Sequence, residues 1–367
     1  MSNKNEEVLL SVRHLKQYFP MGKDSELKAV DDVSFDIKKG EVFGLVGESG
    51  CGKTTTGRSI IKLYDCTGGD VYFKGRRLSA GNRQYIDKIK ECKEKLKSAS
   101  GSEKDALQKE ISEQKAMMKK AKFDHKNADK MYKEETGEKH ALSTKIQMIF
   151  QDPVSSINPR MTVREIIAEG LRIQGEKNEK VVEERVFELL ELVGLVKQHA
   201  DRYPHEFSGG QRQRIGIARA LALKPELIIA DEPISALDVS IQAQVINLLN
   251  DLRESMGLTI MFIAHDLSVV KYFSDRIGVM YFGNLVELAD SDELFAHPVH
   301  PYTKSLLSAI PLPDPHYEKN RTRISYNPAT DHLAGDDKPE LRDCGNGHFI
   351  KCNLAEFEKY KAIINNK

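Results

Sequence analysis

The sequence has 367 residues, a formal net charge of +0 and 40% hydrophobic residues. This length suggests one large or two small domains, and the apolar content is sufficient for a sizeable core. The neutral charge balance gives no support for nucleic-acid binding through bulk electrostatics, so we predict no nucleic-acid partner.

The sequence carries no signal for export or for a membrane span. No apolar run approaches the ~20 residues that a membrane-spanning helix needs. The polar segment 1–7 lacks the apolar core of a signal peptide. The five cysteines, at positions 51, 66, 92, 344 and 352, form neither a disulfide framework nor a Cys-x-x-Cys metal site. A reduced, cytosolic location is the default expectation, and it does not exclude attachment to a membrane protein.

The N-terminal part of the chain is predicted to consist of strands. Val8–Val12 is a short apolar run, and Ala29–Ile37 alternates apolar and polar side chains. Lys39-Gly40 indicates a turn before Glu41–Val46, which is typical of a short buried strand. This last strand leads directly into the most informative loop of the sequence.

That loop is Gly47-Glu48-Ser49-Gly50-Cys51-Gly52-Lys53-Thr54, with the G-x-x-x-x-G-K-[ST] spacing of a phosphate-binding loop. A helix is predicted over Thr55–Tyr64, so the motif lies between a strand and a helix. The glycines let the backbone turn tightly, and successive N–H groups at a helix N-terminus form an anion cradle. Lys53 adds a positive charge for the β- and γ-phosphates, and the Thr54 hydroxyl can bind Mg²⁺.

Residues 80–142, which follow a predicted strand at Asp70–Lys74, differ in composition from the rest of the chain. They are rich in Lys and Glu, and Ser98–Ser102 would break a helix. The apolar side chains at roughly heptad-like spacing are Ile86, Ile89, Leu96, Leu107, Ile111, Met117 and Met118. We predict an antiparallel helical hairpin that stands off the domain, with its narrow seam packed on itself. It is either a docking arm for a partner or regulator, or a solvated insertion without a task.

An α/β pattern resumes after this insertion. Predicted in order are a strand at 145–150, helices at 162–200 and 210–223, a strand at 227–230, a helix at 240–256 and a strand at 258–264, with shorter elements to about 296. The continuous apolar strand at 227–230 is typical of a parallel sheet buried on both faces. From Pro298 onward prolines are frequent, including those at 311, 313 and 315, and we interpret this part as an appendage.

Polar residues follow these strands at positions suited to chemistry. Asp231-Glu232 comes directly after the apolar strand, so Asp231 suits Mg²⁺ and Glu232 is placed to orient or deprotonate an attacking water. Ser208-Gly209-Gly210-Gln211 precedes a helix and can form a second anion-binding nest. Ser235–Asp238 follows shortly after Glu232, and His265 follows the strand at 258–264. A single His or a single Ser-Gly-Gly is more often structural, so the combination carries the argument.

Taken together and in this order, these stretches resemble the nucleotide-binding domain of ABC ATPases. Gly47–Thr54 matches the Walker A loop, Gln151 the Q-loop, Ser208–Gln211 the signature, Leu227–Glu232 the Walker B strand, Ser235–Asp238 the D-loop and His265 the switch histidine. The resemblance covers about residues 8–296, apart from the insertion. It implies an α/β P-loop NTPase with an antiparallel β subdomain, a mostly parallel core sheet, a helical subdomain at about 152–225, an inserted helical hairpin and a small C-terminal appendage.

The resemblance also implies a role for each matching residue. Thr54, Gln151 and Asp231 would complete a Mg²⁺ shell, Glu232 would act on water, and His265 would contact the γ-phosphate. An aromatic side chain before the loop would stack on adenine, for which Phe19 is our choice and Tyr18 the alternative. The residues expected to bind ATP are Phe19, Gly47, Glu48, Ser49, Gly50, Cys51, Gly52, Lys53, Thr54, Thr55, Gln151, Ser208, Gly209, Gly210, Gln211 and Asp238.

In the family architecture, Ser208-Gly209-Gly210 cannot reach the nucleotide of its own chain. It would complete the site of a second ATPase subunit, in a heterodimer or a homodimer, and hydrolysis would require the closed dimer. Gln151 and the helices at 162–200 would pass closure to two transmembrane permease subunits, as a ligand-driven population shift. The chain would then lie peripherally on the cytoplasmic face of the cell membrane, in a complex that also engages an extracellular peptide-binding lipoprotein.

Three segments resemble the di- and oligopeptide importer branch in particular: 150–163, 202–210 and 297–307. Within that branch the chain looks like the F-type ATPase subunit, and residues 297–367 would be the C-terminal extension of the branch. The implied function is ATP hydrolysis that energises uptake of di- and oligopeptides. Relatives with similar ATPases import nickel, opines or sugars, so another cargo is one alternative. A non-transport ABC ATPase is the other.

Two features depart from the pattern of the branch. The insertion at 80–142 is longer than the usual connection there. Gly347–Cys352 resembles only the end of a cysteine-rich tail that can hold an iron–sulfur cluster. Such a cluster needs four thiolates, and only Cys344 and Cys352 are present in this region. We therefore predict ATP and Mg²⁺ as ligands and no iron–sulfur cluster.

Overall fold

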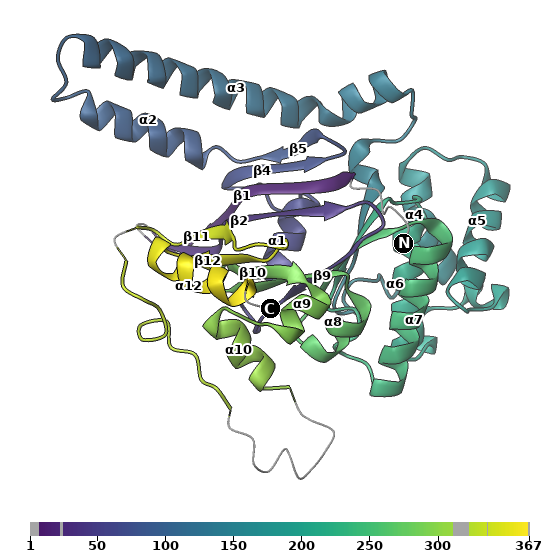
Figure 1. The fold of residues 1–367 in the computed structure, drawn as a ribbon. Helices are drawn as coiled ribbons and strands as arrows, with labels where there is room; N and C mark the ends of the chain where they lie inside the picture. Colours follow the sequence, from purple (N-terminus) through teal and green to yellow (C-terminus); the bar gives the residue numbers. More distant parts are fainter. Residues whose placement is uncertain (1–6, 23–24, 311–322, 336, 366–367) are drawn as a thin grey trace. The chain divides into compact units, whose positions relative to one another are not determined.

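A computed structural model describes residues 7–22, 25–310, 323–335 and 337–365 (Figure 1). The polar N-terminal residues 1–6 and the prolines at 311, 313 and 315 lie outside the described residues. The chain forms two compact units: residues up to 39 together with 54–146, and residues 40–53 together with 147–367. Within the described residues, no helix is both long and apolar enough to cross a membrane.

The first unit contains an antiparallel sheet of four strands in the order β2-β1-β4-β5. Its strands are β1 (Val8–Pro20), β2 (Glu26–Lys38), β4 (Gly68–Phe73) and β5 (Arg76–Ala80). Alternate side chains such as Leu10, Val12 and Val33 are fully buried, which is the pattern expected of a sheet with one covered face. The predicted strands are confirmed, but β1 and β2 are longer than the apolar runs that indicated them. The helix α1 (Lys53–Ile60) follows the phosphate-binding loop, as predicted.

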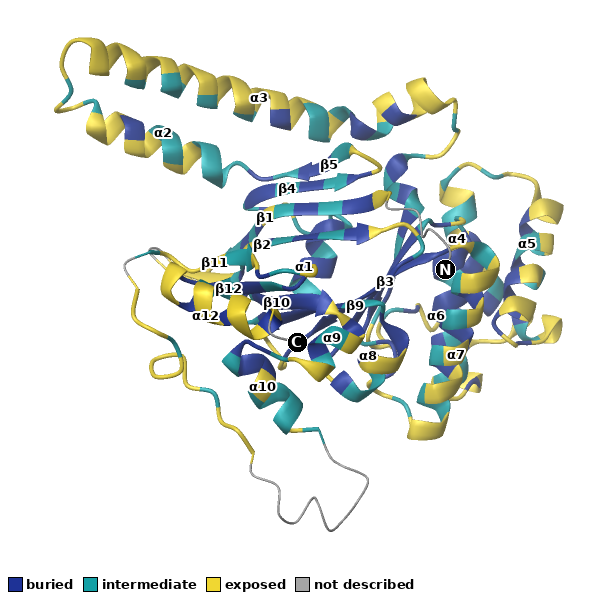
Figure 2. Ribbon diagram, in the orientation of Figure 1, coloured by how far each residue is buried: buried dark blue, intermediate teal, exposed yellow. Residues whose placement is uncertain are grey.

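The insertion in this unit forms the predicted helical hairpin, with α2 (Arg83–Lys95) and α3 (Ser102–Thr136) side by side (Figure 1). The break falls at Leu96–Gly101, close to the serine-rich segment that predicted it. Most of the surface of both helices is exposed (Figure 2), as their Lys- and Glu-rich composition requires. An ion pair between Lys88 and Glu110, with 3.5 Å between Nζ and Oε1, links the two helices.

The predicted packing of this hairpin is wrong in two respects. Ile86 and Met117, expected in the seam, are 51% and 54% exposed. The second half of α3 does not stand free, because it packs against β5 and buries Ala121, Ala128 and Tyr132. The heptad count assumed that the two helices pack only on each other, whereas the sheet determines which stripe of α3 is covered.

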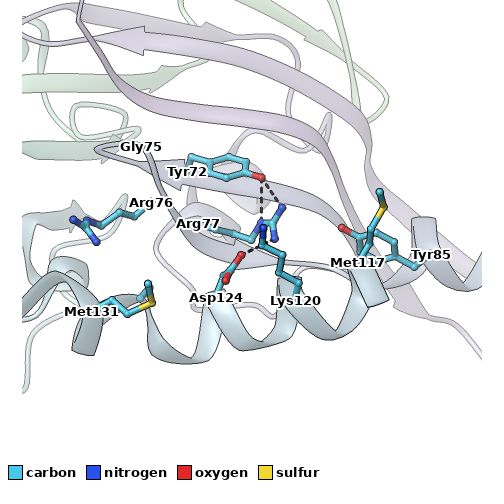
Figure 3. A pocket seen from close by; sticks show the side chains of 10 residues that line it. Tyr72, Gly75, Arg76, Arg77, Tyr85, Met117, Lys120, Asp124 and Met131 are labelled. Carbon is cyan, nitrogen blue, oxygen red and sulfur yellow. Dashed lines mark hydrogen bonds and ion pairs between the residues drawn. The ribbon is translucent and has the colours of Figure 1, made fainter. Parts of the chain in front are cut away.

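Arg77 anchors α3 to the sheet (Figure 3). Its guanidinium donates to the hydroxyl of Tyr72 at 2.8 and 3.1 Å and to Asp124 on α3 at 3.1 Å. A pocket of about 560 Å³ lies here, lined by Tyr72, Gly75, Arg76, Arg77, Tyr85, Met117, Lys120, Asp124, Ala128 and Met131. Since Arg77 is bonded to both neighbours, its part in this pocket is to hold the insertion against β4 and β5.

The second unit contains an eight-stranded sheet in the order β11-β12-β10-β9-β3-β8-β7-β6. Its strands are β3 (Val42–Val46), β6 (Ile146–Ile149), β7 (Leu227–Asp231), β8 (Thr259–Ala264), β9 (Arg276–Tyr281), β10 (Asn284–Asp290), β11 (Glu340–Asp343) and β12 (Phe349–Cys352). The central strands β9, β3, β8 and β7 are parallel neighbours, and β10, β12 and β11 continue the sheet in antiparallel pairs. The central strands β3, β7 and β8 are buried along their whole length (Figure 2), as their apolar sequences predict.

Helices accompany this sheet along the chain. They are α4 (Val163–Ile173), α5 (Glu179–Leu192), α6 (Gly209–Leu221), α7 (Val239–Met256), α8 (Leu267–Phe273), α9 (Ser291–Ala296), α10 (Pro301–Ser308) and α12 (Leu354–Asn365), with short 3₁₀ turns at Leu142–Lys145, Lys197–Asp201 and Pro204–Glu206. The helical region predicted at 162–200 is thus two helices and a 3₁₀ turn. Gly175, with φ of +92°, lies between α4 and α5, and this backbone angle interrupts a helix.

The C-terminal part of the chain contributes to the core of the second unit. Strand β12 pairs with β10, with Ile350 opposite Glu287, so the tail extends the central sheet. Tyr302 on α10 lies in the same buried cluster as Val46 and Val279 of the central strands. The sequence pattern did not predict β11, β12 or α12.

Candidate functional site

Three adjacent parallel strands bring the predicted site residues to one edge of the sheet. The order β3-β8-β7 places the phosphate-binding loop after β3, His265 after β8 and Asp231-Glu232 at the end of β7. In a parallel sheet the carboxyl ends of neighbouring strands lie side by side, and this is where ligands bind in open α/β folds. The topology therefore collects residues that are up to 218 positions apart in the sequence.

The phosphate-binding loop is held close to the neighbouring strand. Gly47 has φ of +151°, and a Cβ added there would lie 2.2 Å from the carbonyl oxygen of Met280. Only glycine fits that position. Further along the loop, the carbonyl oxygen of Cys51 accepts the N–H of Gly283 at 2.9 Å. The turn between β9 and β10 thus fixes the path of the loop.

Lys53 reaches back over this loop. Its ammonium donates to the carbonyl oxygens of Gly47 at 2.8 Å and Glu48 at 2.9 Å, and the residue is only 4% exposed. The charge is therefore held next to the backbone N–H groups that the loop offers to an anion. Cys51 is also buried, and burial raises the pKa of its thiol, an effect that the nearby Lys53 partly offsets.

Glu232 is the centre of a small polar cluster. Its carboxylate accepts a hydrogen bond from the side-chain amide of Gln151 at 2.9 Å, and the same oxygen lies 3.3 Å from His265 Nδ1. The Glu232 side chain is 13% exposed and that of His265 is 55% exposed. The backbone of Glu232 has φ of +44°, a left-handed conformation that costs energy for a residue with a Cβ. Such backbone strain is typical of active-site residues, whose side chains are held in one direction.

Asp231, Gln151 and Thr54 are the residues predicted to hold Mg²⁺. Asp231 is fully buried at the end of β7, next to Glu232. A carboxylate, an amide carbonyl and a hydroxyl are oxygen donors, the ligand type that Mg²⁺ prefers. The chemistry of this donor set fits the ion.

The signature segment forms the N-terminus of α6. Ser208 Oγ accepts from the N–H of Gln211 at 3.4 Å, and the Gln211 side chain accepts from the N–H of Ser208 at 3.0 Å. This is a capping box, in which two otherwise unpaired helix donors are satisfied by side chains. Ser208 and Gly209 are exposed, so they are open to an approaching partner. Gln211, which we expected to bind nucleotide, serves the cap here.

Three further predicted residues occupy defined positions. Asp238 is exposed at the N-terminal end of α7, and Ser235 Oγ donates to the carbonyl oxygen of Glu232 at 3.1 Å.

In the first unit, the half-buried ring of Phe19 packs edge-on against Tyr64, with 5.3 Å between ring centroids. The hydroxyl of the alternative, Tyr18, donates to Asp31. The choice of Phe19 as the adenine-stacking residue stays a prediction, as do the roles of the other site residues.

Sequence reasoning missed a side chain that bonds to the phosphate-binding loop. The N–H of Glu48 donates to the hydroxyl of Tyr302, at 3.1 Å. The two residues are 254 positions apart, and no periodicity or spacing rule connects them. The frequent prolines of this region led us to interpret it as an appendage, so no contact with the phosphate-binding loop was predicted.

Cys344 and Cys352 are both free thiols and both buried. Hydrogen bonding to Cys352 lowers the pKa of the Cys344 thiol. Among the described residues, no group of three or more His, Cys, Asp and Glu side chains is arranged to hold a metal ion. The predicted absence of an iron–sulfur cluster stays a prediction.

Two protein families and several known proteins match the sequence of this chain. Residues 30–139 and 99–235 match the family described as ABC transporter, and residues 286–338 match the oligopeptide/dipeptide transporter C-terminal region. The chain is 54% identical to the oligopeptide transport ATP-binding protein OppF of Bacillus subtilis, over 96% of this chain and 99% of the relative. It is 48% identical to the dipeptide transport ATP-binding protein DppF of Lactococcus lactis, over 96% of each chain.

A solved structure gives a similar result for the fold. It is described as the dimeric, post-hydrolysis state of an ATP-binding cassette bound to ADP and Pi. The alignment has a TM-score of 0.55 at 25% identity and covers 77% of this chain and 99% of that chain.

Proposed function

The chain belongs to the ABC transporter family, in its oligopeptide and dipeptide branch, and from this premise we propose that it hydrolyses ATP to energise peptide import. The observation that carries the proposal is the carboxylate of Glu232, bonded to Gln151 and close to His265 at the strand edge that also holds the phosphate-binding loop. A phosphate-binding loop with its lysine, an Asp that can hold Mg²⁺ and a carboxylate that can orient the attacking water are recurring parts of nucleotide hydrolysis in P-loop proteins.

Each residue has a distinct task in this proposal. The backbone N–H groups of Gly47–Thr55, apart from that of Glu48, which donates to Tyr302, bind the phosphates of ATP together with the Lys53 ammonium. The ring of Phe19 stacks on adenine. Glu232 orients the attacking water and accepts its proton. Its carboxylate lies at the end of β7 and is held there by Gln151 and His265. His265 contacts the γ-phosphate and keeps Glu232 in place. Thr54, Gln151 and Asp231 would hold Mg²⁺, which neutralises charge developing on the phosphates when bound.

The site requires a second subunit. We propose that Ser208, Gly209 and Gly210, together with Asp238 at the N-terminal end of α7, complete the nucleotide site of a partner ATPase. The exposure of Ser208 and Gly209 supports this assignment, since an anion-binding helix N-terminus is left open to solvent in the single chain. The related solved structure described as dimeric is consistent with it. The partner is a second copy or a homologous subunit.

The proposed complex includes two membrane permeases and an extracellular peptide-binding lipoprotein. Large apolar side chains that are exposed near Gln151 and at the end of α4 support a docking surface for the permeases. Val154 is 57% exposed and Ile173 is 73% exposed. The chain would bind there peripherally, on the cytoplasmic face of the membrane. Di- and oligopeptides are proposed as cargo because the relatives at 48–54% identity are named for the transport of these peptides.

Reconstitution with the candidate permeases tests this proposal. The chain is co-expressed and co-purified with candidate permeases of the oligopeptide importer branch, and ATP hydrolysis is measured with and without peptide and a peptide-binding lipoprotein. We expect co-purification and a rate that rises when a peptide is supplied. Failure to hydrolyse ATP in the assembled complex would overturn the assignment. Stimulation by a nickel chelate, an opine or a sugar instead of peptides would leave the ATPase in place and change the cargo.

A further inference from the structure

Tyr302 connects the C-terminal region to the phosphate-binding loop. It lies in the first turn of α10, is 2% exposed, and its hydroxyl accepts the N–H of Glu48 at 3.1 Å. The loop residue that it touches is the second of the motif. Its backbone N–H is therefore bonded within the chain instead of being offered to an anion.

One peptide unit of the loop is held at both ends. The N–H of Glu48 and the carbonyl of Gly47 belong to the same peptide group. The carbonyl accepts from Lys53 Nζ at 2.8 Å, while the N–H donates to Tyr302. A peptide group is planar and rigid, so the direction of its N–H fixes the direction of its carbonyl. The hydrogen bond from Glu48 to Tyr302 therefore fixes the direction of the Gly47 carbonyl, and that carbonyl in turn holds the Lys53 ammonium.

Tyr302 is itself held in place by buried polar contacts. The carboxylate of Glu287 on β10 is fully buried and accepts the N–H groups of Val299 at 2.8 Å and His300 at 3.2 Å. The N–H of Tyr302 donates to His300 Nδ1 at 3.1 Å, which caps α10. The same carboxylate lies 2.8 Å from His348 Nε2. Charged hydrogen bonds in a buried setting are strong and directional, so α10 can present the hydroxyl at a fixed point.

We propose that the Tyr302 hydroxyl is a positioning group for ATP binding, which holds the Gly47–Glu48 peptide so that Lys53 and the loop amides face the phosphates before ATP arrives. This inference rests on the proposed function. It assigns to the C-terminal region a direct part in the nucleotide site of its own chain. Burial raises the pKa of the Tyr302 phenol further above its ordinary value, so the group next to the phosphate site carries no negative charge that would repel the phosphates.

The test uses Tyr302→Phe in the full chain, with Tyr326→Phe as a matched control. Phenylalanine keeps the ring, whose centroid lies 4.5 Å from that of Tyr281, and removes only the hydroxyl. Tyr326 belongs to the same aromatic group, but its hydroxyl contacts His332 Nε2 at 2.9 Å. Binding of a fluorescent ATP analogue, KM and kcat in the assembled complex, and alkylation of Cys51 by iodoacetamide are measured for all three proteins. Melting curves without nucleotide accompany each measurement.

We expect Tyr302→Phe to raise Kd and KM for ATP about fivefold to tenfold and to leave kcat within a factor of two, since bound phosphates order the loop at saturation. Alkylation of Cys51 without nucleotide rises at least threefold, because the loop opens more often. Tyr326→Phe behaves like wild type in both assays. Unchanged KM and alkylation in Tyr302→Phe, or equal changes in the control, would overturn the proposal. A wild-type chain that does not bind ATP would instead overturn the proposed function.

Discussion

The side-chain amide of Gln151 donates to the carboxylate of Glu232, with 2.9 Å between Nε2 and Oε2. That same oxygen lies 3.3 Å from His265 Nδ1. One carboxylate oxygen thus joins the segment that follows β6 to the segment that follows β8. A movement of either segment changes the environment of the proposed base, which gives the site a physical route for linking hydrolysis to closure.

Substitution of Glu232 by Gln is expected to abolish turnover while ATP still binds. The amide is nearly isosteric with the carboxylate, but it cannot accept a proton from water. General-base catalysis contributes typically 10²- to 10⁴-fold, so peptide-stimulated hydrolysis should fall by at least about 100-fold. Hydrolysis and nucleotide affinity are compared in the purified complex. Glu254→Gln, an exposed position on α7, is the control and should retain the wild-type rate. Wild-type turnover in Glu232→Gln would remove this residue from the catalytic role.

Thiol reagents are expected to modify Cys51 slowly, and the modification is expected to block ATP binding. It lies inside the phosphate-binding loop, so an adduct on its sulfur would occupy space that the phosphates need. Because burial raises the pKa of this thiol, little thiolate is present at pH 7, and the reaction should accelerate about tenfold per pH unit above that. Alkylation is mapped by mass spectrometry at several pH values and compared with loss of ATP binding. ATP should protect the site, and Cys51→Ser should keep binding after treatment. A modified Cys51 with unchanged nucleotide affinity would contradict this role.

The core of the site could be predicted because its residues form short motifs that follow buried strands. Gly47–Thr54 and Asp231-Glu232 are each contiguous in the sequence. Each directly follows an apolar run that predicts a buried strand, so its place at the strand end could be predicted. The contact between Tyr302 and Glu48 could not be predicted, since it depends on how Glu287 docks α10. The pairing of β12 with β10 was also missed, because a strand of four residues is too short to show a periodicity and its partner strand lies far away in the sequence. In the insertion, the periodicity of α3 revealed a helix but not that β5 covers part of it.

The two signature glycines are expected to respond differently to alanine. A Cβ at Gly210 would lie 2.5 Å from Ile241 Cγ2, a methyl group on a stiff β-branched side chain, whereas a Cβ at Gly209 would meet Leu237 at an ordinary 3.6 Å. Gly210→Ala should therefore cost about 1–3 kcal/mol of stability. Gly209→Ala should leave the fold intact and lower hydrolysis in the complex at least tenfold, if this face meets the nucleotide of a partner.

The control for these glycines lies on the same helix. Within the described part of the chain, no heavy atom outside the local helix lies within 4 Å of a Cβ added at Gly216. Gly216→Ala should raise stability by about 0.4–1 kcal/mol, as replacement of a helical glycine does, without loss of activity. Thermal melting and hydrolysis in the complex are measured for all three variants. Normal turnover in Gly209→Ala would argue against the proposal that Ser208, Gly209 and Gly210 complete the nucleotide site of a partner subunit.

His300 is expected to make the protein less stable as the pH falls. Its Nδ1 accepts the N–H of Tyr302 and so must be unprotonated, and burial, with smaller effects from His332 and Lys351, lowers its pKa to about 3. Below pH 6.5 the unfolded chain binds a proton on this ring that the folded chain does not, so stability falls from there towards pH 3. The slope from this one group is about 1.4 kcal/mol per pH unit. His300→Asn keeps a side-chain acceptor for the cap but cannot titrate in this range. The difference in unfolding free energy between wild type and this variant, measured in urea from pH 7 to pH 4.5, should therefore change with that slope in favour of the variant. A difference that is independent of pH would mean that His300 is not held neutral in the folded protein.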